Sequence, residues 1–483
     1  MMFNRMVIVL GLVFALTVPV QVPAQTATND GTTLKQIIIF GRHSIRSSTV
    51  DLALLQPFAV DVYPPLFKVA TGCLTANGVT AENLLGTYYS QYLSYEGLLT
   101  GNPRTDALAS YFRSNSIERS WMTANAFGTG LIPSFPPPVH SFSVYPQAPD
   151  PVFDPIAAGV AKVDPNLAAT QVQEIFNSGE ALASAYSGDF SLIRSVLFDY
   201  PLGTQPPPPT PRYCPSGQTQ TFCIDPTAIS IPLTANTQNI KTGSVINVGA
   251  LADTDGANDP FIMQYADGFP MDQVAWGRLP TSEQNCTASE PNCKPDLLSQ
   301  TTRIVDAVFS IEVRTPYLSQ VQSSNAASHI LRTMQQAVTG SKVPGAFGDA
   351  GSRIVVVISS DTYVAGLAGL LNMHWQLPEY QPDYCAPGGA LVFELRQSNR
   401  GYLVRVFYTA QSFDQLRYLR PLTLNDPPKT IQLLVPGGST SATDLDVNFA
   451  VFQKLMNNAI GRQYVENPRK EVPPEPLSGV TCQ

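Results

Sequence analysis

Three short stretches of the sequence carry side chains suited to phosphoryl transfer. The first holds Arg42, His43 and Arg46, the second holds Arg119, and the third holds Asp361. Guanidinium groups bind phosphate oxygens through charge-assisted and often bidentate hydrogen bonds, and they stabilise the charge on those oxygens during the reaction. We therefore expect the three arginines to bind a phosphate group.

His43 is the candidate nucleophile. It lies between Arg42 and Arg46, and nearby positive charge disfavours the imidazolium form, so we expect its ring to be neutral. A neutral imidazole nitrogen can attack phosphorus and form a phosphohistidine. Asp361 would then protonate the leaving alkoxide and later take a proton from the attacking water.

Each of these residues also has a structural alternative. A short Arg-His-x-x-Arg motif can arise by chance or form a surface cluster. Arg119 can be a solvated helix residue, and Asp361 or Thr362 can simply stabilise the first turn of a helix. The elements that precede the three stretches decide between these interpretations.

A strand is expected before each stretch. Residues 35–40 and 354–358 are rich in β-branched side chains and predict buried strands, and a short strand is expected near residues 111–112. Residues 114–116 are predicted to cap a helix that runs to about residue 128. Ligands of open α/β sheets bind at the carboxyl ends of the strands, where helix N-termini add partial positive charge. We therefore expect the three stretches to meet in one pocket.

The distribution of proline-rich runs and periodic segments predicts two domains in the chain. Between proline-rich runs, residues of about 145–300 predict a smaller, mostly helical insertion, which leaves residues 31–144 and 301–483 to form an α/β domain. Other elements predicted from periodicity and turn residues are helices at 80–95, 170–182 and 325–338, the last ending at Gly340, and a hairpin of residues 391–395 and 403–408 around residues 399–401.

Composition limits the class of protein. The chain has 483 residues, of which 44% are hydrophobic and 14% charged, and its formal net charge is −8. This is enough apolar material for a packed core, so disorder is not expected. A general nucleic-acid partner is not expected either, because such proteins carry a basic face. An anionic substrate would need positive charge gathered locally in its site.

The N-terminus resembles a cleaved signal peptide. Arg5 precedes an apolar run over residues 6–18, and residues 22–24 read Val-Pro-Ala, a small-residue cleavage pattern. The apolar run is too short to span a bilayer. We therefore expect residues 1–24 to be removed and the protein to be secreted or periplasmic; the alternative is a buried N-terminal helix.

The cysteines predict disulfides rather than a metal site. All seven follow residue 24, and an exported chain can oxidise them. Local bridges Cys214–Cys223 and Cys286–Cys293 are plausible, the connectivity stays open, and an odd number leaves at least one thiol over. No Cys-x-x-Cys motif is present. The other histidines, His140, His329 and His374, lack a partner pattern and are expected to be structural.

At this point the sequence resembles the histidine acid phosphatase family. Residues 42–48 are similar to its Arg-His-Gly-x-Arg-x-Pro signature, and residues 74–78, 118–120, 276–278 and 372–394 are similar to further segments of its bacterial phytase and glucose-1-phosphatase branch. The resemblance covers most of the chain after residue 24. It implies an α/β fold, with a mixed central sheet flanked by helices and a smaller helical domain over the site. It also implies a phosphohistidine mechanism without a cofactor, in which Arg42, His43, Arg46, Arg119 and Asp361 match functional positions.

The sequence departs from the family pattern at informative places. The family's His-Asp pair reads Ser360-Asp361 here, so Ser360 is expected to contact phosphate with a neutral donor. Replacing a charged hydrogen bond by a neutral one costs about 1–2 kcal/mol, or roughly 5- to 30-fold in rate. The motif's glycine and proline are Ser44 and Ser48, and Val50 stands where phytate-cleaving members often have lysine. Further candidates for substrate contacts are Thr49, Asp259 and Thr362.

Taken together, these features predict an exported acid phosphatase that acts on a small phosphomonoester, with phytase or sugar-phosphatase activity. The main alternative is a relative that binds phosphate esters but has weakened or lost catalysis because of Ser360. A cytoplasmic mutase with a phosphohistidine is a third interpretation, and the N-terminal segment argues against it.

Overall fold

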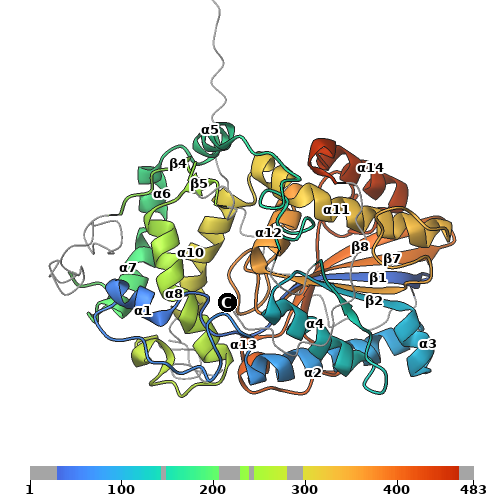
Figure 1. Ribbon diagram of the computed structural model, residues 1–483, viewed down its shortest axis with the longest axis horizontal. Helices are drawn as coiled ribbons and strands as arrows, with labels where there is room; N and C mark the ends of the chain where they lie inside the picture. Colours follow the sequence, from blue (N-terminus) through green and yellow to red (C-terminus); the bar gives the residue numbers. More distant parts are fainter. Residues whose placement is uncertain (1–29, 143–147, 206–228, 239–243, 280–296, 467–483) are drawn as a thin grey trace, which may run out of the picture.

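The computed structural model describes residues 30–142, 148–205, 229–238, 244–279 and 297–466. The predicted signal peptide and the cysteine pairs Cys214–Cys223 and Cys286–Cys293 lie outside these residues. The described residues form two lobes, one built on a central sheet and the other built mainly of helices (Figure 1). No helix among them is long and apolar enough to cross a membrane.

One mixed sheet forms the centre of the larger lobe. Its strand order is β10-β8-β7-β1-β6-β2-β3, and β9 pairs with β8. The strands β1, β6 and β2 are parallel, whereas β7 runs antiparallel to β1. The bounds are β1 Thr33–Arg42, β2 Ser110–Ser114, β3 Val139–His140, β6 Ile354–Ser359, β7 Ala390–Ser398, β8 Gly401–Ala410, β9 Lys429–Gln432 and β10 Val447–Asn448.

The parallel strands bring the ends of three chain segments to one edge of the sheet. In the register of the sheet, Arg42 of β1 lies opposite Ser359 of β6, and Ser114 of β2 lies opposite Ile358. All three strands therefore end at the same level, where the helices that follow β2 and β6 begin. This edge is the one that the sequence predicts to bind a ligand.

Helices cover both faces of this sheet. The helices α2 (Ala76–Tyr95) and α4 (Glu118–Leu131) pack on one face, and α11 (Pro316–Thr339), α12 (Asp361–Leu370) and α14 (Phe449–Ala459) lie on the other (Figure 1). Side chains of a strand alternate between faces, so both sets on β1 must be apolar. Ile37 and Ile39 join the first layer, and Ile38 and Phe40 join the second.

The second lobe is mainly helical. It contains α5 (Pro165–Phe176), α6 (Gly179–Ala185), α7 (Ser187–Leu197), α8 (Ala250–Ala266), α10 (Leu297–Glu312) and the strand pair β4 (Thr234–Ala235) and β5 (Ile246–Asn247). The short helices elsewhere are α1 (Leu52–Leu55), η1 (Gln56–Phe58), α3 (Pro103–Leu108), η4 (Val274–Gly277), α13 (Phe413–Arg417) and η5 (Arg462–Tyr464).

Residues that follow β1 also reach the second lobe. The backbone amide of Val60 donates to Leu197 at 2.9 Å, and the Tyr63 hydroxyl donates to Ala257 at 2.9 Å. Arg278, in the Trp-Gly-Arg segment, forms ion pairs with Asp61 and Asp199. Arg278 therefore holds this segment in place, which is a structural role. The lobes also share one hydrophobic cluster, which runs from Phe40 of β1 into α8 and α10.

Most predicted elements are present, with three corrections. The strands at residues 35–40 and 354–358, the hairpin, and the end of a helix at Gly340 (φ 66°) are confirmed, but that helix begins earlier, at Pro316. The predicted cap of α4 at residues 114–116 is wrong: Ile117 is the N-cap and no side chain caps the helix. The amide of Asn115 still donates to Ile358 of β6 at 3.1 Å, and this delays the start of the helix.

The third correction concerns residues 170–182, which form two helices rather than one. The chain breaks at Asn177, whose φ is 68°, and Ser178 caps the second helix by accepting a hydrogen bond from Ala181. A Cβ on Gly179 would lie 1.7 Å from the carbonyl oxygen of Ile231. The break therefore accompanies a close backbone approach that a side chain at residue 179 would block.

Candidate active site

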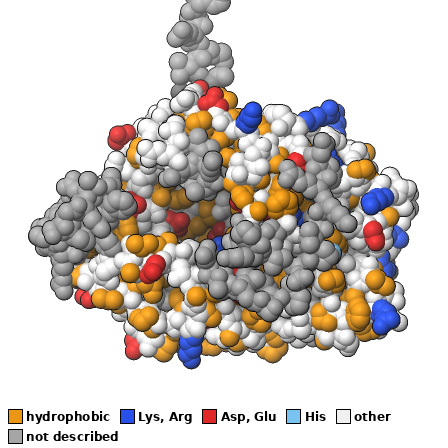
Figure 2. All heavy atoms as spheres, viewed as in Figure 1, with side chains coloured by type: hydrophobic (Ala, Val, Ile, Leu, Met, Phe, Trp, Pro, Cys, Tyr) orange, Lys and Arg blue, Asp and Glu red, His pale blue; other side chains and the backbone are white. Residues whose placement is uncertain are grey.

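A cavity of about 340 Å³ lies at the carboxyl edge of the sheet, against the second lobe. Figure 2 shows a hollow between the two lobes, in which acidic side chains are visible. Every residue proposed from the sequence as a site residue lines this cavity: Arg42, His43, Arg46, Thr49, Arg119, Asp259, Ser360, Asp361 and Thr362. The structure thus brings together residues from β1, α4, α8 and α12.

The loop after β1 is fixed by backbone hydrogen bonds. The amide of His43 donates to Ser359 at 2.8 Å, and its carbonyl accepts from the amide of Gly388 at 3.1 Å. Further along, the carbonyl of Ile45 accepts from the amide of Thr75 at 3.0 Å. A Cβ on Gly78 would lie 2.2 Å from that same carbonyl oxygen. Glycine at residue 78 therefore lets the first turn of α2 support the loop directly.

His43 is buried and held in one tautomer. Its Nδ1 atom lies 2.9 Å from the carbonyl oxygen of Ser44, which can only accept, so Nδ1 carries the proton and Nε2 keeps a lone pair. Burial lowers the pKa of His43 well below its usual value, and the charges of Arg119, Arg42 and Arg46 lower it further. The expectation of a neutral ring is confirmed, and Arg119 adds to the effect of the two neighbouring arginines.

Two of the three arginines are held by carboxylates and the third by a carbonyl. Arg42 lies 2.9 Å from Asp361, Arg46 forms two hydrogen bonds of 2.7 and 2.8 Å with Asp259, and Arg119 donates to the carbonyl of Gly72 at 3.2 Å. Burial, and then the charge of Arg46, lower the pKa of Arg119 to about 10, so it remains protonated at neutral pH.

These arginines still have unused donors. The Nε group of each of the three is buried and has no hydrogen-bond partner among the described residues. The three guanidinium groups line one cavity and concentrate positive charge there. Such groups bind a phosphate group through charge-assisted hydrogen bonds.

Asp361 and Ser360 lie at the start of α12. Asp361 is the first residue of the helix and its Oδ1 atom accepts from the amide of Thr362 at 3.0 Å, so it does act as a first-turn acid. It also faces the cavity through its ion pair with Arg42. Ser360 is the N-cap residue, but its side chain makes no capping hydrogen bond. Its hydroxyl group is therefore not committed to the helix.

Three further polar residues of the cavity, Asp255, Asn258 and Tyr384, are not predicted by the sequence. Asp255 of α8 has its pKa raised to about 8 by burial and by the charges of Asp259 and Asp361. Tyr384 hydrogen bonds to Arg42, and its pKa is raised mainly by burial. Asp255 lies four residues before Asp259, a spacing that places both on one face of a helix, and this spacing could have identified Asp255 as a cavity residue. Tyr384 carries no local signal.

The remaining candidates lie outside the cavity. His329 stacks on Phe347, His140 stacks on Tyr111, and His374 is exposed and contacts Asp383. Cys385 has a buried free thiol group, and its backbone carbonyl accepts a hydrogen bond from Arg42 at 2.5 Å. Within the described residues no cluster of His, Cys, Asp and Glu could hold a metal ion.

Comparison with known proteins finds relatives that match most of the chain. No protein-family model matches the chain. The chain is 28% identical over 435 residues to phytase AppA of Escherichia coli, covering 88% of this chain and 92% of that protein. It is 25% identical over 445 residues to glucose-1-phosphatase of Salmonella typhimurium, covering 91% and 95%.

The fold has close counterparts among solved structures. The phytase of Hafnia alvei in complex with myo-inositol hexakis sulphate superposes with a TM-score of 0.74 at 25% identity, and the match covers 91% of this chain and 100% of that chain. The mixed sheet with helices on both faces is therefore the fold of these phosphatases. In its fold, and in sequence over 88–91% of its length, the chain is therefore similar to the histidine acid phosphatases of the bacterial phytase and glucose-1-phosphatase branch.

Proposed function

We propose that the protein is an exported acid phosphatase that hydrolyses phosphomonoesters through a phosphohistidine on His43. The observation that carries this proposal is the state of His43: a buried, neutral imidazole with its Nε2 lone pair available, in a cavity with three arginines and Asp361. Such a nitrogen is a competent nucleophile toward phosphorus when its target is held by cationic donors.

The reaction has two balanced steps. In the first, Nε2 of His43 forms a bond to phosphorus as the ester P–O bond breaks, and the carboxylic acid of Asp361 gives its proton to the leaving alkoxide. In the second, water attacks phosphorus while the Asp361 carboxylate takes its proton, and the P–N bond breaks. The products are an alcohol, inorganic phosphate and neutral His43.

The surrounding residues have distinct roles in this proposal. Arg42, Arg46 and Arg119 bind the phosphoryl oxygens, and Ser360 adds a neutral donor at the start of α12. Asp259 acts mainly by orienting Arg46, since both of its oxygens are used in that pair. Thr49 and Thr362 contact the rest of the substrate. We assign export to the N-terminal segment and propose neither a cofactor nor a metal.

The alternative is a phosphate-ester-binding protein without turnover. Ser360 favours it, because the family's charged donor next to Asp361 is missing. The retained nucleophile, arginines and acid favour the enzyme, since the covalent scheme depends on them most. The two functions differ in whether phosphate is released.

The decisive experiment is a phosphate-release panel on the purified mature protein from pH 3 to 8, with aryl, sugar and inositol phosphates. We expect release by the wild type, none by His43→Ala, and wild-type rates for His374→Ala, a substitution outside the cavity. Rapid quenching with labelled substrate should trap an acid-labile label on His43. Binding without release across the panel would support the alternative, and wild-type turnover in His43→Ala would rule out the phosphohistidine.

A further inference from the structure

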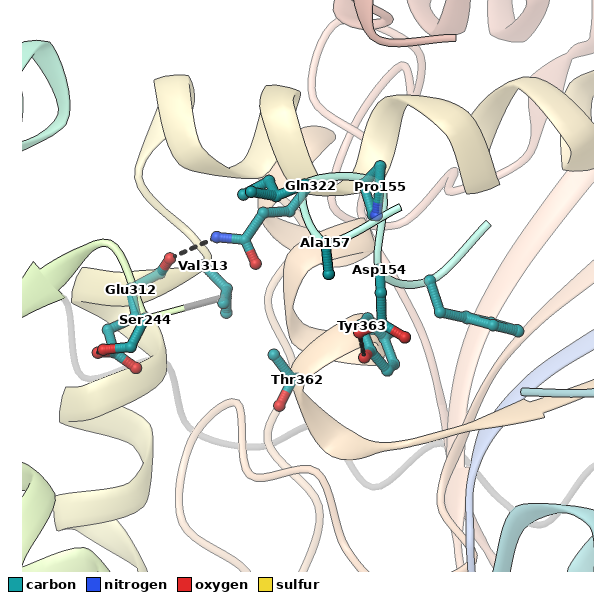
Figure 3. Close-up of a pocket in the computed structure, with 11 residues that line it drawn as sticks. Asp154, Pro155, Ala157, Ser244, Glu312, Val313, Gln322, Thr362 and Tyr363 are labelled. Carbon is teal, nitrogen blue, oxygen red and sulfur yellow. Dashed lines mark hydrogen bonds between the residues drawn. The ribbon is translucent and has the colours of Figure 1, made fainter. Parts of the chain in front are cut away.

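A second cavity of about 210 Å³ adjoins the first. Figure 3 shows it between α12, the end of α10, the start of α11 and the segment around residue 155. Thr362 lines both cavities, so α12 forms a wall that they share. The charge of Glu312, in the second cavity, also acts on Asp255 in the first. Both observations place the second cavity next to the phosphoryl site.

The second cavity is polar and built from ordered contacts. Gln322 donates to the backbone oxygen of Glu312 at 2.9 Å, and Ser244 donates to its carboxyl oxygen at 3.1 Å (Figure 3). Tyr363 donates to Asp154. The hydroxyl group of Thr362, a residue that lines this cavity, has no hydrogen-bond partner among the described residues. The wall therefore offers hydroxyl, amide and carboxyl groups in fixed positions.

The described residues that line this cavity include no Lys, Arg or His. They include two carboxyl groups, Asp154 and Glu312. Burial raises the pKa of Glu312 to about 7, and burial also raises the pKa of Asp154. At acidic pH the carboxyl group of Glu312 is therefore largely neutral and can donate as well as accept hydrogen bonds. At higher pH it becomes an anion.

Among the described residues, the lining of the first cavity has no spare cation either. Its three arginines face three aspartates, namely Asp255, Asp259 and Asp361. Once the arginines bind one phosphoryl group, no other cationic side chain among the described lining residues remains for a second phosphate. A substrate with several phosphates would have to place the others against carboxyl groups, which offer a phosphate no cationic partner at any pH and repel it once they ionise.

We propose that the second cavity, lined by Asp154, Ser244, Glu312, Gln322, Thr362 and Tyr363, is a subsite for the uncharged, hydroxyl-rich part of a phosphomonoester. Carboxyl and amide groups are suited to the hydroxyl groups of a polyol ring, and Tyr363 offers an aromatic surface for its C–H face. The protein thus prefers a polyol monophosphate, such as a hexose phosphate, to an inositol polyphosphate. This inference rests on the proposed function and specifies its substrate.

The test compares substrates that differ in the part outside the phosphate. For the wild type at pH 5, we expect kcat/KM for a hexose phosphate or an inositol monophosphate to exceed that for inositol hexakisphosphate by about 10-fold or more. Glu312→Lys should shift this ratio toward the hexakisphosphate, and Glu174→Lys, at an exposed position of α5, should not. Because Glu312→Lys risks misfolding, Gln322→Ala is the second variant, expected to lower kcat/KM for the hexose phosphate by roughly 2- to 10-fold relative to an aryl phosphate.

A binding measurement separates the two proposals. Calorimetric titration of His43→Ala with hexose phosphate, inositol hexakisphosphate and inorganic phosphate reports on the subsite without turnover. Tighter binding of hexose phosphate than of inorganic phosphate supports the subsite even if no substrate is hydrolysed. If the wild type does not hydrolyse aryl phosphate, that result counts against the proposed function alone. Equal or better binding and turnover of the hexakisphosphate would overturn the subsite while leaving the phosphatase intact.

Discussion

Ser360 is the residue at which this chain departs most consequentially from its family's pattern. Its hydroxyl group makes no capping hydrogen bond, and it lines the cavity next to Asp361. An imidazolium at residue 360 would add a charged donor for the transition-state oxygens. We predict that Ser360→His raises the rate on a small aryl phosphate at pH 4.5 by about 5- to 30-fold, and that the gain fades at pH 7.5 as the new ring loses its proton.

Steady-state kinetics at both pH values, beside the wild type, check this prediction. Ser341→His, at an exposed position after α11, is the control for a new histidine elsewhere. If Ser360→His keeps its circular dichroism spectrum but gains nothing at pH 4.5, the cavity has adapted to serine and the prediction is wrong.

The ionisation of His43 gives a second prediction for a single residue. Its pKa is lowered by burial first and by Arg119 next, so the ring stays neutral as the pH falls through 6.5. NMR titration of the ring should give a midpoint below that of histidine in the urea-unfolded chain. Arg119→Gln should move the midpoint upward, because it removes the charge that lowers the pKa of His43 most. A midpoint unchanged by Arg119→Gln would show that the charge of Arg119 does not act on His43 and would contradict the prediction.

At the scale of elements, glycines set how closely α2 and α4 approach. A Cβ on Gly86 would lie 2.1 Å from the carbonyl oxygen of Phe127, and a Cβ on Gly130 would lie 2.0 Å from that of Asn83. We predict that Gly130→Ala lowers the free energy of unfolding by about 1–3 kcal/mol, because the helices must separate. Gly188→Ala in α7, where no atom lies near the added methyl group, should be neutral or stabilise by up to about 1 kcal/mol.

Urea unfolding of the two variants decides this comparison. The position of α4 matters for the site because Arg119 is its second residue. A loss of stability in Gly188→Ala as large as that in Gly130→Ala would show that helix propensity, rather than the close approach, is responsible.

The sequence predicts these elements unevenly, for physical reasons. The strands β1 and β6 are short runs of β-branched residues buried on both faces, so their composition identifies them. The strands β3 and β10 contain two residues each and exist only through pairing with distant strands, so no local pattern marks them. The same holds for the site: Arg42, His43 and Asp361 follow recognisable strands, whereas Tyr384 reaches Arg42 only through tertiary packing.

At the scale of the whole molecule, buried carboxyl groups of the second lobe should make stability depend on pH. The pKa of Asp255 is raised to about 8 and that of Glu312 to about 7, in both cases mainly by burial, and burial raises the pKa of Asp306 well above its usual value. The folded state therefore binds protons that the unfolded state releases above about pH 4. The stability that these three carboxyl groups contribute is therefore lost as the pH rises through this window.

We predict a higher melting temperature at pH 5 than at pH 8 in differential scanning calorimetry. Asp306→Asn should reduce that difference, because both carboxyl oxygens of Asp306 are buried without a hydrogen-bond partner among the described residues and the amide cannot ionise. Glu174→Gln, at an exposed position of α5, should leave the difference as it is. A protein more stable at pH 8 than at pH 5 would contradict the prediction.

The hydrophobic cluster that joins the two lobes restricts how this protein can be recombined with its relatives. Phe40 of β1 belongs to the same cluster as Phe261 of α8 and Leu298 of α10, so the lobe over the site is not a detachable module. A chimera that took this lobe from a relative would cut through that cluster and leave mismatched packing, at about 1–3 kcal/mol for each overpacked position. Substitutions of the polar residues in the cavity walls leave the cluster intact, so directed evolution of this protein should change its substrate range through point mutations at those residues rather than domain exchange.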